Sequence, residues 1–197
     1  MERKGSDWDQ RATLERLVDR QDILDCLTRI ARAVDRSDRE LFLSGFHDDA
    51  VLDAGGFVNA PDRVFDGART GHEHGQSSTL HNLLNHTCEI DGATAHTETY
   101  FFFTGVNRDG TNWVGGGRYL DRFERREDGW RIAFRYTLME WSGFVSPATV
   151  PLFDNLPDLH RNGSPQRSHS DPSYRRPLIN LRDLRFPDDV ERLGEPG

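Results

Sequence analysis

Four strand-like segments follow one another in the second half of the chain, and short turn sequences separate them. Each segment is bounded by Asp, Gly or Asn, and the connections Asp-Gly, Arg-Asp-Gly and Glu-Asp-Gly favour hairpin turns. The segments span residues 79–90, 94–106, 111–126 and 129–141. Because consecutive strands joined by hairpins form an antiparallel sheet, this feature restricts the fold more than any other.

Helical patterns precede the sheet. From Trp8 to about Asp35, apolar residues recur at three- and four-residue spacing with charged residues between them, which predicts one long or one broken amphipathic helix. A shorter helix over residues 38–46, capped by Ser37 or Asp38, and a short strand ending in two glycines follow. Residues 57–78 hold turn formers without a sustained period, so we expect loops around a small strand, with one short helix as an open alternative.

Helices followed by such a sheet predict an α+β fold in which the helices close one face of a curved sheet. Several predicted strands carry apolar residues at both odd and even positions, as in Tyr100 to Phe103. Because these positions face opposite sides of the sheet, both faces are expected to be covered. One face would meet the helices and a pocket, and the other a neighbouring subunit. We divide the chain into a helical extension (1–19), a central domain (20–145) and a proline-rich C-terminal arm (146–197).

Composition narrows the partners and the compartment. A net charge of −8 argues against a dedicated surface for nucleic acid or anionic membranes, so the expected partner is a small molecule or another subunit. Cys26 and Cys88 are the only cysteines, and the chain shows neither a signal-peptide pattern nor a membrane-spanning apolar stretch. We therefore expect a cytoplasmic protein with two buried, inert thiols.

Three residues are candidates for catalysis. The helical period places Asp35 near the face that turns toward the sheet, although an exposed aspartate at a helix end is the plainer interpretation. His81 shares a strand face with Leu83 and Asn85, and a hydrogen-bonded core histidine is the alternative there. Arg135, central in the last strand, needs an anionic partner, either in a structural ion pair or in a pocket.

Other residues carry weaker signals. His86 points to the opposite strand face from Asn85 and is the weaker candidate. The His-x-His pair of His72 and His74 resembles part of a metal site, but no further ligands appear at suitable spacing, and we expect a polar loop at the pocket mouth without metal. Candidate substrate contacts, chosen for their aromatic or amide side chains, are Asn85, Tyr100, Phe102, Trp113, Tyr119 and Trp141.

Several stretches occur in an order that resembles the SnoaL-like branch of the NTF2-like superfamily. They are the helix end AVDRSD, the strand HDDAVLD, the His81-to-Asn85 HxxxN pattern and the hairpin GGRYLDRFERREDGWRIAFR, within about Arg20 to Trp141. The resemblance implies a cone of helices on a curved antiparallel or mixed sheet that encloses a pocket, usually in a trimer. It also implies kinship with scytalone dehydratase, hexachlorocyclohexane dehydrochlorinase, bile-acid dehydratase and lignin-dimer formaldehyde lyases.

The resemblance further implies an Asp–His dyad of Asp35 and His81, with Arg135 as a pocket arginine. The chain departs from the dehydrochlorinase at Ile30, where that enzyme has a helix lysine, and it lacks the helix tyrosine of many dehydratases. Halide elimination is therefore disfavoured, and the group that assists the leaving atom is unassigned. We expect a cofactor-independent lyase that removes a proton from an aromatic or polycyclic molecule and releases water or formaldehyde.

Two alternatives stay open at this level. The same dyad can return the proton elsewhere, which would make the protein an isomerase or a polyketide-cyclase-like enzyme. A non-catalytic role in ligand binding, or in assembly as in the small subunits of ring-hydroxylating dioxygenases, predicts instead that Asp35 and His81 lie apart or face solvent, without a closed cavity.

Overall fold

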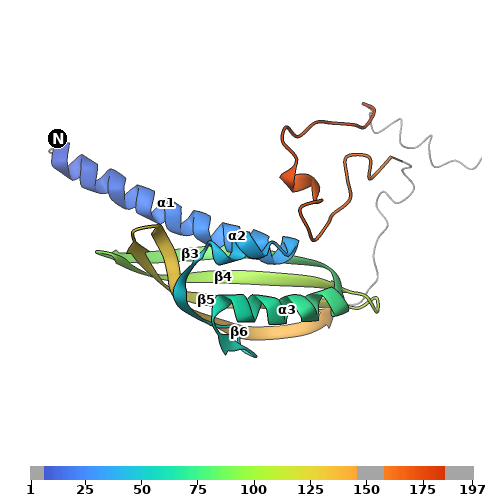
Figure 1. The fold of residues 1–197 in the computed structure, drawn as a ribbon, viewed down its shortest axis with the longest axis horizontal. Helices are drawn as coiled ribbons and strands as arrows, with labels where there is room; N and C mark the ends of the chain where they lie inside the picture. Colours follow the sequence, from blue (N-terminus) through green and yellow to red (C-terminus); the bar gives the residue numbers. More distant parts are fainter. Residues whose placement is uncertain (1–6, 146–157, 185–197) are drawn as a thin grey trace, which may run out of the picture.

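The computed structural model describes residues 7–145 and 158–184. Within these residues helices come first and a six-stranded curved sheet follows, which confirms the α+β prediction (Figure 1). The strand order is β2-β1-β6-β5-β4-β3, in which β1 runs parallel to β6 and the other neighbours are antiparallel. The elements are α1 (Asp7–Arg36), α2 (Arg39–Leu43), β1 (Phe46–Asp53), β2 (Val58–Asn59), α3 (Pro61–Gly75), β3 (Gln76–Asp91), β4 (Thr94–Asn107), β5 (Asn112–Arg126), β6 (Gly129–Val145) and the 3-10 helix η1 (Pro172–Tyr174).

Helix α1 is one continuous helix, and its two halves meet different surroundings. The second half packs its apolar side into the core through residues that are at most 2% exposed: Ile23, Cys26, Leu27, Ile30 and Ala33. The first half extends away from the sheet and leaves Leu14, Leu17 and Val18 exposed (Figure 1). The amphipathic period therefore identified the helix, but only its C-terminal half is covered within the monomer.

A glycine run allows the sheet to bend beside the cavity. The pairing of β5 with β6 shifts register between Gly116 and Gly117. A Cβ atom at Gly117 would lie 2.1 Å from the carbonyl oxygen of Leu138, so no larger residue fits this close approach of two backbones. The irregularity re-aims the strands and contributes to the curvature that makes room for a pocket.

Residues 61–75 form a helix of 15 residues, where the sequence predicted mainly loops. Pro61 occupies the first turn, where its missing N–H costs nothing. Val64 and Phe65 are buried, and the Phe65 ring packs 4.8 Å from that of Phe42 in α2. The expected small strand is present as β2, but the helix is longer than expected because packing against α2 stabilises an amphipathic segment that contains Gly67 and other turn formers.

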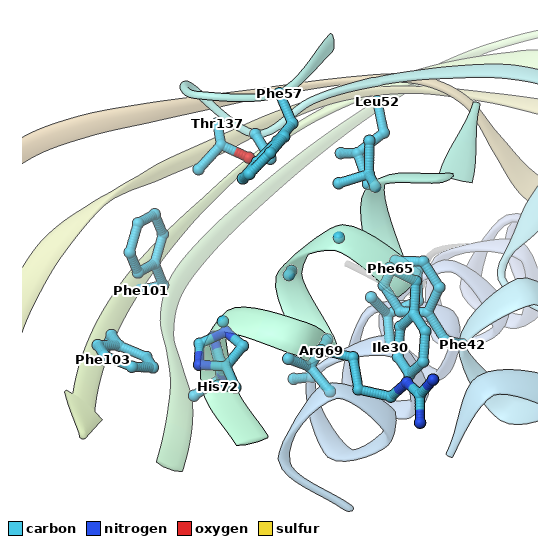
Figure 2. A pocket seen from close by; sticks show the side chains of 18 of the residues that line it. Ile30, Phe42, Leu52, Phe57, Phe65, Arg69, His72, Phe101, Phe103 and Thr137 are labelled. Carbon is cyan, nitrogen blue, oxygen red and sulfur yellow. The ribbon is translucent and has the colours of Figure 1, made fainter. Parts of the chain in front are cut away.

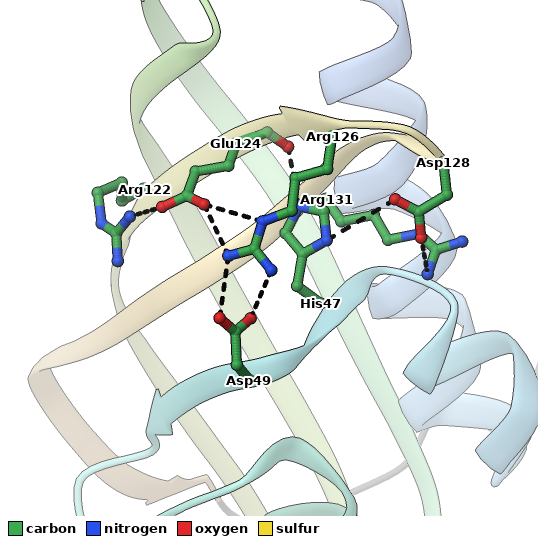
Figure 3. Close-up of polar contacts among 7 residues, drawn as sticks. All are labelled: His47, Asp49, Arg122, Glu124, Arg126, Asp128 and Arg131. Carbon is green, nitrogen blue, oxygen red and sulfur yellow. Dashed lines mark hydrogen bonds and ion pairs between the residues drawn. The ribbon is translucent and has the colours of Figure 1, made fainter.

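Strand β1 is joined to the β5–β6 hairpin by a network of charged side chains (Figure 3). Arg126 pairs with Asp49 at 2.7 Å and with Glu124 at 2.7 Å. The His47 imidazole Nε2–H donates to the carbonyl oxygen of Glu124 at 2.9 Å, and burial is the main cause that lowers the pKa of His47. These contacts hold β1 against the β5–β6 hairpin.

The arm is described between residues 158 and 184, and it lies beside the C-terminal end of α1 and beside α2 (Figure 1). Tyr174 and His169 both donate hydrogen bonds to Asp38, the N-cap residue of α2. The expected boundary at residue 146, and the arm residues 146–157 and 185–197, lie outside the described residues. Within the described ranges, no helix is long and apolar enough to cross a membrane.

Candidate active site

The concave side of the sheet and the three helices enclose a cavity of about 510 Å³. Its wall is mainly apolar and aromatic, with contributions from α1, α2, α3 and five strands (Figure 2). Phe103 packs edge-on against Trp113 at 4.9 Å, and Phe101 stacks on Tyr119 at 4.4 Å. A cavity of this size and lining suits a flat, ring-containing small molecule.

Asp35 and His81 are in direct contact at the wall of this cavity. Asp35, which is 7% exposed, lies at the end of α1, and its Oδ1 is 2.6 Å from the His81 Nδ1. The same carboxylate accepts hydrogen bonds from the Thr79 hydroxyl at 3.1 Å and from the His81 backbone N–H at 2.9 Å. His81 lines the cavity, and its ring lies 4.8 Å from the Phe103 ring.

The hydrogen bond to Asp35 determines which tautomer the neutral His81 ring adopts. A carboxylate only accepts hydrogen bonds, so the proton of the neutral ring sits on Nδ1 and the lone pair sits on Nε2. The two additional hydrogen bonds hold the carboxylate in one orientation. The arrangement can therefore present a base to a molecule in the cavity and stabilise the imidazolium that forms after proton transfer.

Arg135 and Tyr119 form a second polar group in the cavity wall. Arg135 makes a two-pronged ion pair with buried Asp121, at 2.7 Å from Nε and 2.8 Å from Nη2. Burial opposes the Arg135 charge, but Asp121 more than offsets it and raises the pKa of Arg135. The Arg135 guanidinium lies 4.3 Å from the centre of the Tyr119 ring, and burial raises the pKa of Tyr119 to about 12.

Both interpretations of Arg135 thus apply, since it has an ion-pair partner and also lines the cavity. Asp121 was not singled out from the sequence. Its partner across the β5–β6 ladder is Arg135, and a register shift between Arg122 and Phe123 sets this pairing, so the sequence of the hairpin alone does not show it.

His72 is the second histidine in the cavity wall, and it belongs to α3 rather than to the expected loop (Figure 2). Its Nδ1 makes a short contact with the side-chain oxygen of Gln76, so Nδ1 carries the proton. Burial is the main cause that lowers the pKa of His72, which keeps the ring neutral at neutral pH. His74 is exposed, and its Nδ1–H donates to the carbonyl of Thr70 at 2.7 Å.

The remaining predicted substrate contacts divide between the two faces of the sheet. Trp113 and Tyr119 line the cavity. The cavity wall does not include Asn85, Tyr100, Phe102 or Trp141. On β4 the residues Phe101 and Phe103 point inward, so alternation turns Tyr100 and Phe102 outward, where the Phe102 ring lies 6.0 Å from that of Trp141.

Asn85 and His86 exchange their expected faces because of a bulge in β3. Leu83 pairs with Phe101 and His86 pairs with Thr99, so two residues, Leu84 and Asn85, stand opposite Tyr100 alone. Asn85 is therefore exposed, and His86 turns inward, where its Nδ1 is 2.9 Å from the Thr99 hydroxyl. The assignment of Asn85 to the face of His81 was wrong, since strict alternation ends at a bulge.

Both cysteines are buried, as predicted, and burial raises the pKa of Cys26 to about 11. Within residues 7–145 and 158–184, no group of three or more His, Cys, Asp and Glu side chains is placed to hold a metal ion. Two arginines of the cavity wall, Arg69 and Arg167, were missed. Arg69 fell in the segment taken for loops, and Arg167 lies in the arm, far from the other wall residues in sequence.

Similar structures support this fold. A hexachlorocyclohexane dehydrochlorinase of type 3 from Novosphingobium barchaimii has a TM-score of 0.62 and 19% identity, with 70% of this chain and 96% of that one covered. Two proteins of Novosphingobium aromaticivorans have similar structures as well. One is proposed to be an aromatic ring hydroxylase (TM-score 0.59, 27% identity, 66% and 94% covered), and the other a scytalone dehydratase (TM-score 0.60, 15% identity, 66% and 90% covered).

These structural neighbours share the fold of this chain, with helices packed on a curved sheet. The model of the SnoaL-like domain family matches residues 15–136, which is more than half of the sequence. The chain therefore belongs to the SnoaL-like domain family. No protein with a curated description matches it.

Proposed function

We propose that the protein is a cofactor-independent lyase that acts on an aromatic or polycyclic small molecule. The observation that carries the proposal is the 2.6 Å contact between Asp35 Oδ1 and His81 Nδ1 at the wall of a cavity of about 510 Å³. The aromatic lining supports the substrate class. A dehydrochlorinase and a proposed scytalone dehydratase are among the proteins that share this fold, and both names fit an elimination.

In the proposed reaction, His81 Nε2 takes a proton from substrate carbon, and the electron pair of that bond forms a double bond as a neighbouring oxygen departs. Asp35 stabilises the imidazolium, and the proton then joins the departing oxygen to give water. In the formaldehyde variant, His81 takes a hydroxyl proton. The carbon–carbon bond next to that hydroxyl breaks, formaldehyde leaves, and the electron pair that stays on the aromatic fragment takes the proton back from the His81 imidazolium.

Assistance to the leaving or developing oxygen is assigned to Tyr119 and Arg135. The raised pKa keeps the Tyr119 phenol protonated, so its O–H is a donor inside a buried wall. Arg135 stays charged while Asp121 offsets part of that charge. A well-placed donor contributes roughly 3 kcal/mol to transition-state stabilisation. Asn85 takes no part in the proposal because it lies outside the cavity wall.

The non-catalytic alternative receives less support. An assembly subunit was expected to keep Asp35 and His81 apart or solvent-facing, whereas the two side chains are hydrogen-bonded and His81 lines a cavity. The isomerase alternative requires the same geometry, so only the product separates it from a lyase.

Product analysis by mass tests the proposal. The wild-type protein is incubated with hydroxylated aromatic, steroid and lignin-type compounds, beside Asp35→Asn and His81→Ala. Asp22→Asn and His96→Ala, both at exposed positions, serve as matched controls. We expect loss of water or formaldehyde with wild type and controls but not with the dyad variants. A product of unchanged mass would mean an isomerase, and no conversion by wild type would favour a binding or assembly role.

We also propose that the protein works as a homo-oligomer, with a trimer favoured, in the cytoplasm. Support for the oligomer comes from the outer face of the sheet, where large apolar side chains are exposed: Leu80, Leu84, Tyr100, Phe134, Tyr136 and Trp141. Contiguous exposed apolar surface is typical of subunit contacts. Light scattering after gel filtration measures the mass, and a monomer at all concentrations would contradict the proposal.

A further inference from the structure

A second histidine lines the same part of the cavity as the proposed base. The rings of His81 and His72 both pack on Phe103, at centroid distances of 4.8 and 6.2 Å, and all three residues belong to the cavity wall. His81 comes from β3 and His72 from α3, and Figure 2 shows the His72 ring beside Phe103. The proposed proton transfer uses His81 alone, so the role of His72 is still to be assigned.

Gln76 holds the His72 ring from a position one helical turn away. Its backbone N–H donates to the His72 carbonyl oxygen, and its side-chain oxygen accepts a hydrogen bond from His72 Nδ1–H. Gln76 is 6% exposed, and its side chain fills a space that exists because residue 105 is a glycine. A Cβ atom at Gly105 would clash with the Gln76 amide nitrogen. The His72 side chain therefore has a built support, as the His81 side chain has in Asp35.

The two supports differ in charge, so the two histidines are suited to different roles. The Asp35 carboxylate stabilises an imidazolium at His81, whereas the Gln76 amide is neutral and favours protonation of His72 much less. Burial lowers the pKa of His72 more than any other cause, and the hydrogen bond with Gln76 opposes this shift only in part. His72 is therefore a neutral ring with its proton on Nδ1 and a lone pair on Nε2, the atom that a ligand can meet.

A helix-capping role explains His72 less well than a role in the cavity. A histidine near the C-terminus of a helix stabilises it best when the ring is charged and contacts the last carbonyl groups. His74 lies in the same last turn, is exposed, and donates its Nδ1–H to the Thr70 carbonyl oxygen at 2.7 Å. His74 thus already supplies such a contact, whereas His72 is half-buried, neutral and placed in an aromatic wall.

We propose that His72 is a substrate-binding residue whose Nε2 accepts a hydrogen bond from a hydroxyl group of the substrate, in the part of the cavity that His81 shares. The inference rests on the proposed function in taking this cavity as the substrate site, and it deepens that proposal by naming a group that the substrate carries. The substrate is a hydroxylated aromatic molecule whose hydroxyl group is separate from the bond on which His81 acts. An analogue without this O–H leaves Nε2 unpaired and binds more weakly.

Isothermal titration calorimetry with 2-naphthol and 2-fluoronaphthalene tests the acceptor, because the two molecules have the same rings and only the first has an O–H group. The titrations use the His81→Ala variant, so that the proposed base cannot serve as the acceptor. We expect this variant to bind 2-naphthol about fivefold more tightly than 2-fluoronaphthalene, the size expected for one neutral hydrogen bond. Adding His72→Phe, which keeps a flat ring without the acceptor, should remove most of this preference.

His74→Phe in the same background is the matched control, since it changes an exposed histidine of the same helical turn and should leave the preference unchanged. Circular dichroism checks that each variant is folded. Equal binding of the two probes by the His81→Ala variant, binding of neither, or a preference that survives His72→Phe would overturn the inference.

NMR of the wild-type protein with isotope-labelled histidine tests the same contact without a substitution. The nitrogen resonance of His72 Nε2 reports whether its lone pair accepts a hydrogen bond. We expect 2-naphthol to shift this resonance upfield and 2-fluoronaphthalene to leave it nearly in place. An Nε2 resonance that saturating 2-naphthol does not move would overturn the inference. The two proposals fail separately, because a hydroxyl contact at His72 in a protein that converts no compound would contradict the lyase but not this binding site.

Discussion

Both faces of the sheet are rich in aromatic residues, but the side chains of the inner face are buried and those of the outer face are exposed. On the inner face, Phe101 and Phe103 are each 4% exposed, while Tyr100 and Trp141 on the outer face are 39% and 49% exposed. The difference comes from what covers each face. Helices α1 and α3 close over the inner face and leave a cavity, whereas nothing within the described residues covers the outer aromatic side chains.

The aromatic content of a segment therefore predicts a strand, but it does not predict which face of the sheet lines the cavity. Side chains alternate between faces, so a shift of one residue moves a candidate from the cavity to the surface. The chemistry follows the inner face, since His81, Arg135 and Tyr119 all line the cavity.

The largest difference is expected in stability. Phe123 is fully buried under the helices, and Phe134 is 39% exposed on the outer face. Phe123→Ala should lower the free energy of unfolding by about 3–5 kcal/mol because it leaves a cavity in the core. Phe134→Ala should cost less than about 1 kcal/mol, as measured by urea denaturation. Equal costs would contradict the contrast, and a cost of Phe134→Ala that depends on protein concentration would reveal an outer-face contact.

The next difference concerns turnover. His81→Ala removes the proposed base and should lower kcat by about 100-fold or more, with folding intact by circular dichroism. His96→Ala, at an exposed position of the adjacent strand β4, should leave kcat within a factor of about 2, because exposed side chains away from a site have small effects. Similar losses in the two variants would mean that the inner face is not the reactive one.

Ligand affinity should distinguish the tryptophans. Trp113 lines the cavity and packs against Phe103, whereas Trp141 is half exposed on the other face. Trp113→Leu should weaken binding of an aromatic ligand by roughly tenfold, as expected for the loss of one stacking partner. Trp141→Leu should leave the Kd unchanged and should instead lower the oligomer mass. Titration calorimetry and light scattering check the two outcomes.

The smallest effect is the response of the arm to pH. Burial alone would raise the pKa of Asp171, but hydrogen bonds from Gln166 and Ser173 and the charge of Arg36 lower the pKa to about 2. A carboxyl group with a depressed pKa stabilises the docked arm above its ordinary range and loses this contribution as pH falls toward about 2.

Two-dimensional NMR of the Gln166 and Ser173 amides follows this transition. The amide shifts should titrate with a midpoint near the low pKa of about 2. A midpoint near the ordinary value for aspartate, about 4, would show that Asp171 does not anchor the arm.

The sequence predicted the elements whose signals are local. The long helix, the hairpin-linked strands and the proximity of Asp35 to His81 follow from periodicity, turn residues and family resemblance. It predicted loops and a short helix where α3 runs for 15 residues, because the glycines and histidines of this segment are typical of loops and the packing of Phe65 on Phe42 is a tertiary contact. It also assigned Asn85 to the wrong face of the sheet. The bulge in β3 arises from its pairing with β4 and cannot be predicted from the sequence of β3 alone.

Contacts that form only through tertiary packing could not be predicted from local sequence patterns either. Asp121 and Arg135 stand opposite each other because the pairing of β5 with β6 shifts register between Arg122 and Phe123. Arg167 joins the cavity wall through an arm without periodic sequence, held by contacts such as Arg36 with Asp171. Neither spacing nor composition encodes these contacts locally.

The central claim is that Asp35 and His81 act as one unit in proton removal. A double-mutant cycle with Asp35→Asn, His81→Ala and the combined variant tests it directly, with kcat measured on a compound that wild type converts. If the residues act together, Asp35→Asn lowers kcat by about 100-fold or more and the double variant loses no more than His81→Ala alone. Losses that multiply in the double variant, or a near-normal kcat in either single variant, would contradict the account.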